Sequence, residues 1–549
     1  MKHPLRRIRP AWSPVLLAAL ATPAVAQSDV VEPNAYAILP VQHLTGVHQP
    51  TPRLPFQSMV GLRRLESWPF LVHARAEPEC VVEFDELFEI VHLLDRRFEE
   101  EADGARLDAR EGRLHVTAPK AHLAETKALL AALDDHLVCE VQIDAVVIRH
   151  DGTLLPPTIV QPDQARGLFE SHDPVWRGKA QTPAGMTSYL GRHTATRYLH
   201  TYEPQISEGR QLAVPTFDEA FDGVGMLVAP HRVISDDDLV VQVQFAIGRL
   251  DTLVDHQTGL SLQGDLQRPL VDTTTGCMSA RIPNGGALVF NATAPAELGG
   301  NVTIVVRARH EPPKAKLPAD VAVLPTSALT SFGGIWPRFH DSERLVGGRE
   351  DLHESYDEEP QSGRFDADEL QDLLHSNVSP DSWDDTAHAL FRRGRLLLIA
   401  EGETRERAIS FLRMIERTSL VNAELRLDLG DGRITMPTML DRNHTVRHGR
   451  ETTAVRRVNG EVAKNASILV PEVARVFDGA SFAIRPYDAG QRLGAELTWL
   501  MRRSTEAPRP QSLPAQLGAG RDHQGAIPEG GLDTGAGALG AERWTLRRP

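Results

Sequence analysis

The chain has 549 residues, of which 41% are hydrophobic, and a formal net charge of −15 at pH 7. This length predicts three or four domains, and the acidic balance argues against binding to a nucleic-acid backbone or to an anionic lipid surface. The three cysteines, Cys80, Cys139 and Cys277, form no C-x-x-C pair, which excludes a disulfide scaffold and the common zinc patterns. For Cys80 and Cys139 two states stay open: a disulfide bridge, or two buried free thiols.

The first 26 residues have the features of an export signal. Four basic residues between Lys2 and Arg9 precede a short apolar run from Val15 to Ala21, and Ala24-Val25-Ala26 forms a small-residue cleavage site. The apolar run is too short to span a bilayer, and no later run reaches 18 apolar residues. We therefore expect export with cleavage before Gln27, and no transmembrane helix.

One sequence pattern occurs twice at an offset of 256 residues. Val214-Pro215, Phe221-Asp222-Gly223 and Pro230 recur as Val470-Pro471, Phe477-Asp478-Gly479 and Pro486. Six identities in one register predict an internal duplication, which is the signature of a repeated structural unit.

A second repeated pattern precedes each copy of the first. Asp-Glu-Leu opens an apolar helical stripe at 85–87 and again at 368–370. A Gly-Arg-Leu strand follows at 112 and at 394, then an amphipathic helix and an alternating strand, 140–144 or 424–428. Each small module should therefore consist of helix, strand, helix and strand, after an edge strand at its start. Two helices would cover one face of a small sheet.

The segments after each module are rich in predicted strands. Leu239–Ile247 should present Val241, Val243, Phe245 and Ile247 on one face, because strand side chains alternate. Asn284-Gly285-Gly286 predicts a hairpin turn between strands over 278–282 and 287–290. Further strands are expected at Val302–Val306, Ser481–Ile484 and Ala495–Leu500.

These patterns predict an α+β fold: a tandem duplication of a small α/β module followed by a mostly antiparallel β module. The Pro- and acid-rich composition of the middle predicts a linker, and the Pro/Gly/Gln-rich end predicts disorder. The expected divisions are a signal peptide (1–26), an N-terminal segment (27–79), a first α/β module (80–150), a first β domain (151–310), a linker (311–363), a second α/β module (364–430), a shorter β module (431–503) and a disordered tail (504–549).

Pro380-Asp381-Ser382-Trp383-Asp384, followed by Gly394-Arg395-Leu396 and the helix over 404–417, resembles the small N-terminal α/β modules of secretins. Secretins serve type II and type III secretion and type IV pili, and the form resembled is the divergent one of planctomycete-type envelope proteins. Phe221–Pro230 and the strand over 239–247 are similar to the secretin core. The resemblance covers most of 80–310 and 364–503, and it implies a secretin-like fold and an envelope location.

The resemblance stops short of the pore. After Phe290 the chain lacks the V-P-x-L-G-D-I-P-like stretch that secretins carry near their pore. It also alternates module and β segment twice, whereas a secretin has several modules and then one core. We therefore do not extend the resemblance to a gated channel.

No residue pattern predicts catalysis, cofactor binding or a metal site. The chain has no H-E-x-x-H, G-x-S-x-G or Walker motif. For each weaker candidate, a structural or chance origin is favoured over a functional site. These candidates are scattered histidines (His43 with His48; His193 with His200 and His231), a solvated acidic turn (Asp236-Asp237-Asp238), a core tryptophan (Trp383), carboxylates on a solvated strand face (Glu140 with Asp144; Glu424 with Asp428), a structural turn (Gly223-Val224-Gly225) and a chance G-x-G-x-x-G in the tail (Gly535, Gly537, Gly540).

The leading hypothesis is a non-catalytic, exported envelope protein that acts as a docking or assembly component. Its partners would be envelope proteins, including copies of itself, with no nucleic acid and no cofactor, and its location the periplasm or the outer membrane. Two alternatives stay open. One is a secretin-type outer-membrane channel subunit, and the other is an exported hydrolase of unrecognised type, because catalytic groups can converge from distant positions.

Overall fold

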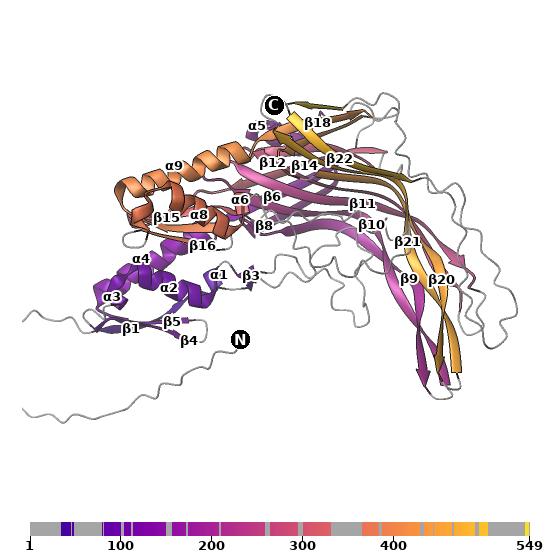
Figure 1. Cartoon of the computed structure of the whole chain (residues 1–549), viewed down its shortest axis with the longest axis horizontal. Helices are drawn as coiled ribbons and strands as arrows, with labels where there is room; N and C mark the ends of the chain where they lie inside the picture. Colours follow the sequence, from indigo (N-terminus) through magenta and orange to yellow (C-terminus); the bar gives the residue numbers. More distant parts are fainter. Residues whose placement is uncertain are drawn as a thin grey trace, which may run out of the picture.

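A computed structural model describes part of the chain, and every structural statement below concerns this part (Figure 1). The protein is mostly antiparallel β-sheet with a few helices. The described residues are 34–45, 47–48, 79–80, 82–99, 104–110, 113–149, 156–171, 174–207, 210–235, 237–258, 264–294, 300–330, 365–383, 387–392, 394–428, 433–442, 444–463, 466–488, 493–502 and 544–547.

The largest sheet has seven strands in the order β22-β21-β20-β12-β11-β10-β9. All neighbouring strands are antiparallel, and several run for about twenty residues, far longer than usual. The strands are β9 (Ser188–Ser207), β10 (Arg210–Arg232), β11 (Leu239–His256), β12 (Leu266–Ile282), β20 (His444–Ala463), β21 (Ala466–Asp488) and β22 (Leu493–Arg502).

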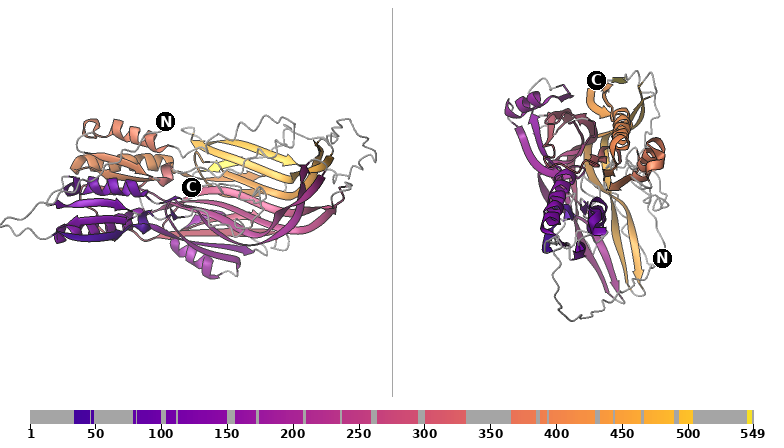
Figure 2. Two further views of the ribbon diagram at one scale, coloured as in Figure 1. Left: turned by 90° about the horizontal axis from the view of Figure 1, so that it is seen from below. Right: turned by 90° about the vertical axis from the view of Figure 1, so that its left-hand side faces the viewer.

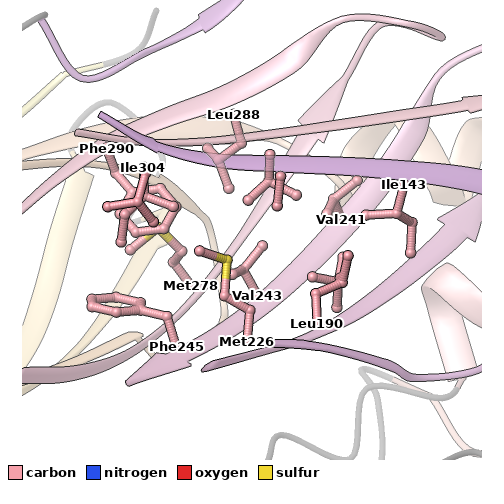
Figure 3. Close-up of a cluster of buried hydrophobic side chains, with 14 of the residues drawn as sticks. Ile143, Leu190, Met226, Val241, Val243, Phe245, Met278, Leu288, Phe290 and Ile304 are labelled. Carbon is pink, nitrogen blue, oxygen red and sulfur yellow. The ribbon is translucent and has the colours of Figure 1, made fainter. Parts of the chain in front are cut away.

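A five-stranded sheet packs on one end of this large sheet and forms a β-sandwich with it. Figure 3 shows side chains of both sheets pointing toward one another, among them Ile143, Val243, Phe245, Phe290 and Ile304. Helix α5 (Pro162–Ser171) covers the outer face through Ala165 and Phe169. The sheet consists of β7 (Thr158–Val160), β13 (Ala287–Thr293), β14 (Asn301–His310), β6 (Glu140–Arg149) and β8 (Pro174–Pro183), in that order.

Away from the sandwich, the two long hairpins β9–β10 and β20–β21 extend together as an arm (Figure 1). Tyr202, Leu266, Ile468 and Val470 pack between them. The Thr201 hydroxyl donates to the backbone oxygen of Pro471 at 2.7 Å.

These hairpins match in detail. β20 and β21 begin and end 256 residues after β9 and β10. Each hairpin also has one register shift, which falls at Thr216/Phe217 in the first and at Val455/Arg457 in the second. The shift skips His200 on β9 and Arg456 on β20, positions that are again 256 apart. The repeated Val-Pro and Phe-Asp-Gly sequences occupy the same places in β10 and β21.

Two small α/β modules lie beside the sandwich. In the first module, strands β1-β5-β4 form a sheet covered on one face by α2 and α4. The capping box of Glu83 and Glu86 begins α2. The first module consists of β1 (Ala35–Pro40), α2 (Phe84–Leu94), α3 (Arg96–Glu99), β4 (Arg106–Arg110), β5 (Arg113–Ala118) and α4 (Lys120–Leu137), and α1 (Gln42–Thr45), β2 (Val47–His48) and β3 (Glu79–Cys80) adjoin it.

The second module repeats this order of elements. Its sheet is β15-β17-β16, and α8 and α9 cover one face. Asp366 caps α8 by accepting from the Glu369 N–H at 2.7 Å. The second module consists of β15 (Val321–Pro325), α8 (Ala367–Asn377), β16 (His388–Arg392), β17 (Arg395–Ile399) and α9 (Gly402–Ser419), with α6 (Ser327–Thr330) and a 3-10 turn (Pro380–Ser382) between them.

Each module is thus strand, helix, strand, strand, helix. The expected edge strand at the start of each module is confirmed as β1 or β15, but the order of helix, strand, helix, strand after it is wrong, because an additional strand, β4 or β16, precedes the predicted one. The strand expected to close each module lies in another sheet: β6 joins the five-stranded sheet, and β18 (Asn422–Asp428) pairs with β19 (Arg433–Met439) and β23 (Trp544–Arg547). Strands β1 and β15 fall in the segments assigned to the N-terminal segment and the linker, and β23 falls in the tail expected to be disordered.

The predicted hairpin at Asn284-Gly285-Gly286 is also wrong. Strands β12 and β13 flank this turn but do not pair with each other: residues 278–282 of β12 pair with β11, and β13 pairs with β14 and β7. The turn therefore carries the chain from the large sheet to the five-stranded sheet. Gly285 has a φ of +79°, which favours glycine. The strands expected within 239–247, 302–306, 481–484 and 495–500 are confirmed.

Candidate docking surface

Within the described part of the chain, the candidate residues predicted from the sequence do not come together in one catalytic or metal-binding site. No group of three metal-ligating side chains occurs among the described residues. His43 pairs with Asp134 at 2.8 Å, and His193 with the Tyr189 hydroxyl at 2.8 Å. His231 is buried at the end of β10, where burial lowers its pKa to about 3. The signal segment and Gly535, Gly537 and Gly540 lie outside the described residues.

One carboxylate differs from expectation. Asp144 is buried, not solvated, because it pairs with Arg307 at 2.5 Å. The Arg307 guanidinium also lies 4.7 Å from the centre of the Phe169 ring. Through Arg307, Asp144 links β6 to β14 and α5. Glu140, the other carboxylate of the sequence pair, is exposed. The geometry is that of a structural ion pair.

The acidic turn, the tryptophan and the glycine also have structural roles. Asp238 accepts from Arg281 at 2.9 Å. Trp383 is buried in the second module and donates to the Val378 oxygen at 2.6 Å. Gly223 lies within strand β10 and not at a turn as expected, but its φ of +144° does require glycine, since a Cβ would lie 2.3 Å from the Arg192 oxygen.

A small cavity of about 10 Å³ lies where the two modules meet the sandwich. Such a volume holds no more than about one water. Cys139 lines it as a buried free thiol, and burial raises its pKa, so it is not a reactive thiolate. Arg395 donates to the Ala184 oxygen at 3.0 Å, and burial lowers its pKa to about 10. The cavity is part of the packing between the modules.

The larger feature is the way in which the two modules stack. Figure 2 shows the layers in order: first sheet, first helices, second sheet, second helices. One face of the second sheet packs under α8 and α9 through residues such as Leu396 and Leu398. The other face packs on the first module through Val321 and Leu397, which join the cluster of α2 and α4. The second sheet is therefore buried on both faces.

In the part of the chain that the structure describes, the first sheet is covered on one face only. Leu39, Leu114 and Val116 point toward α2 and α4. The alternate residues form the open sheet face, where Tyr36 is 60% exposed and Ile38 is 46% exposed. Strand register places nine residues on this face: Tyr36, Ile38, Pro40, Arg106, Asp108, Arg110, Arg113, His115 and Thr117.

The open sheet face is basic and locally ordered. Three arginines stand against one aspartate, and Asp108 pairs with Arg110 at 2.5 Å. The Tyr36 hydroxyl and His115 Nδ1 are 2.5 Å apart. These side chains combine exposed apolar area with cationic groups, a composition suited to protein contact.

Two buried carboxylates, one in each module, make hydrogen bonds that connect the helices to neighbouring segments. In the first module Asp95 meets His122 at 2.7 Å and Arg97 at 2.8 Å. Burial alone would raise the pKa of Asp95, but the hydrogen bonds from Arg97 and His122 hold it below its usual value. In the second module Glu416 of α9 accepts from the Ser235 N–H at 3.0 Å and from the Ile234 N–H, which anchors α9 to the end of β10.

Sequence reasoning missed the open sheet face. Its first strand, Ala35–Pro40, lies inside the segment assigned to 27–79, and it is a short apolar run in which polar residues do not alternate with apolar ones. The periodicity of such a run does not distinguish a strand from part of a buried helix. The six residues are too few to stand out without their partner strand.

No protein-family model matches the chain, and no curated protein matches it in sequence. Two solved structures are similar to it in part. One is the V. cholerae type IV competence pilus secretin PilQ, with 14% identity, a TM-score of 0.21, and 38% of this chain and 69% of that chain covered. The other is the ETEC pilotin–secretin AspS–GspD complex, with 11% identity, a TM-score of 0.21, and coverage of 41% and 59%. A TM-score of 0.21 carries no argument about this chain.

Within the described residues, no helix combines the length and apolarity needed to cross a membrane.

Proposed function

We propose that this chain is a non-catalytic, exported assembly component of the cell envelope, related to secretins, that works by docking its α/β modules. One observation carries the proposal. The second module's sheet is buried on both faces, while the equivalent outer face of the first sheet is left open with Tyr36 and Ile38 exposed. Apolar side chains left uncovered on the sheet face of a stacked module are typical of a contact site.

Further support comes from the sequence. The basic start and the Ala24-Val25-Ala26 site favour export. The Pro380–Asp384 and Gly394–Leu396 stretches resemble secretin modules, as described above. The equal spacing of the two long hairpins, with the register shift at the same place, supports a tandem duplication of the whole unit.

The test is cross-linking in intact cells that express the full chain, followed by fractionation and mass analysis. The proposal predicts a chain that begins near Gln27, is found in the envelope or periplasm, and is cross-linked into a complex larger than the chain. The replacement Ile38→Asp should remove it from that complex. A chain with an uncleaved start in the cytoplasm, or one that is never cross-linked, would contradict the proposal.

A further inference from the structure

The strand pairing of the two modules has the same register. Pro40 pairs with Arg113 in the first sheet, and Pro325 pairs with Arg395 in the second. Helix α9 begins and ends 282 residues after α4, and both helices have 18 residues. Helices α2 and α8 both have 11 residues, 283 apart. Positions in the matched strands and helices of one module therefore have counterparts in the other.

The exposed fractions of counterpart residues show which sheet positions the stacking of the modules covers. Tyr36 of the first sheet corresponds to Val321 of the second. Tyr36 is 60% exposed, while Val321 is 2% exposed because it packs on the first module. The open sheet face is thus the same surface that, in the second module, receives a helix layer.

The helices show the reverse. Ile90 of α2 is 4% exposed, and its counterpart Leu373 of α8 is 37% exposed. Ala132 of α4 is 3% exposed, and its counterpart Met414 of α9 is 53% exposed. The layer of α8 and α9, called the outer helix layer below, thus leaves apolar side chains uncovered where the first module has them buried.

The open sheet face and helix α8 of the outer helix layer also have complementary charge. The open sheet face has Arg106, Arg110 and Arg113 against Asp108. Helix α8 and its cap expose four carboxylates, Asp366, Asp368, Glu369 and Asp372, and contain no lysine or arginine. Helix α9 is mixed in charge, with four arginines and three glutamates, so the acidic part of the outer helix layer is α8. Opposite potentials of this kind favour encounter and fix register.

The large sheet also has an edge in the first half of the chain that no further described strand fills. Strand β20 is the counterpart of β9, and β12 fills its outer edge by pairing residues 271–277 with 445–451. The corresponding edge of β9, residues 189–195, pairs with no further strand in the described part of the chain. In the modules and in the large sheet alike, the uncovered sheet face and the unpaired strand edge therefore belong to the first half of the chain.

We infer that the partner of the open sheet face is the outer helix layer of a second copy of this chain, which stacks head to tail as the two modules do within one chain. The inference rests on the proposed docking function and names its partner. Such a contact joins two different surfaces, so its repetition either closes a ring or continues as a filament. Each chain would then contribute two successive modules to the stack.

The test mixes two variants, each damaged on one surface. Ile38→Asp disables the open sheet face, and Met414→Asp disables the outer helix layer. Each alone should weaken self-association of the purified mature chain by about tenfold or more. Their mixture should form a one-to-one dimer and nothing larger, because one intact pair of surfaces remains. Val254→Asp, at another exposed apolar position on β11, is the matched control and should associate like the parent chain.

Native mass, measured over a range of concentrations, decides the matter. A parent chain that stays single at every soluble concentration would overturn the inference, as would either variant that dimerises alone as well as the parent. If Ile38→Asp leaves the envelope complex although the purified parent never self-associates, the docking function stands and the second copy is not the partner. If Ile38→Asp changes neither, both proposals fall.

Discussion

The first and second modules have the same elements and the same strand register, and they differ in what covers their sheets. Strand β5 reads Arg-Leu-His-Val-Thr, apolar at every second residue, and one of its faces is open. Its counterpart β17 reads Arg-Leu-Leu-Leu-Ile, and both of its faces are buried. A strand covered on both sides becomes a continuous apolar run. His115 and Leu397 occupy equivalent positions in the two modules. The comparison shows that the polar residue is found where the sheet face is open, and the apolar residue where another layer covers it.

The largest effect should come from truncating that covered position. Leu397→Ala should cost about 2–5 kcal/mol of folding free energy, since Leu397 is 4% exposed between two layers. The counterpart His115→Ala should cost less than about 1 kcal/mol, because its face is solvated. Denaturant unfolding followed by tryptophan fluorescence measures both. Equal costs would mean that the second sheet is not covered by the first module.

The next comparison concerns the two long helices. Glu416 of α9 holds the backbone of Ile234 and Ser235 and is fully buried, whereas its counterpart Asp134 of α4 pairs with exposed His43. Glu416→Ala leaves buried donors unpaired and should cost about 2–4 kcal/mol. Asp134→Ala should cost less than about 1 kcal/mol, as surface pairs do. The same unfolding measurement applies, and a cost for Asp134→Ala as large as that for Glu416→Ala would refute this account of the anchor.

The smallest effect is a difference in acid sensitivity. Asp95 pairs with His122 and Arg97, and the pKa of Asp95 is lowered; its counterpart in the second module is Val378. A lowered folded pKa adds stability above the unfolded value of about 3.9, and that stability is lost as pH falls through the folded pKa. Asp95→Asn should therefore cost about 1–3 kcal/mol at pH 7. Unfolding curves from pH 7 to pH 3 should show the difference shrinking below about pH 4, and a constant difference would contradict this.

Local sequence patterns predict much of the fold. Val241, Val243, Phe245 and Ile247 lie together in the sandwich core as their alternation predicts. The amphipathic stripe of Ala408, Leu412 and Ile415 faces the second sheet from α9. Strong periodicity over many residues is visible in one sequence because side-chain direction follows the backbone period.

The assignment of strands to sheets could not be predicted. Strand β6 looked half-buried from Glu140 to Asp144, but it is a central strand of the sandwich because Val146, Val147 and Ile148 continue it with both faces buried. Strand β12 looked like one side of a hairpin, but its partners β11 and β20 lie in different halves of the chain. Such pairing is decided by contacts far apart in sequence, which the local pattern does not contain.

The candidate docking surface was hidden for the same reason. Nothing in Ala35–Pro40 marks it as part of a module whose other strands begin some seventy residues later. Only the pairing of β1 with β5, and the comparison with β15, shows that Tyr36 and Ile38 occupy positions where the second module has buried Val321 and partly buried Val323.

The most direct test of the central claim is a disulfide cross-link between copies. Two variants of the mature chain, Ile38→Cys and Met414→Cys, each with Cys80→Ser, are mixed under oxidising conditions and mapped by mass spectrometry. The account predicts that residue 38 of one chain links to residue 414 of another, and that neither variant alone forms a linked dimer. Linkage of 38 to 38, or no linkage while the chains associate, would show that the open sheet face does not receive the outer helix layer.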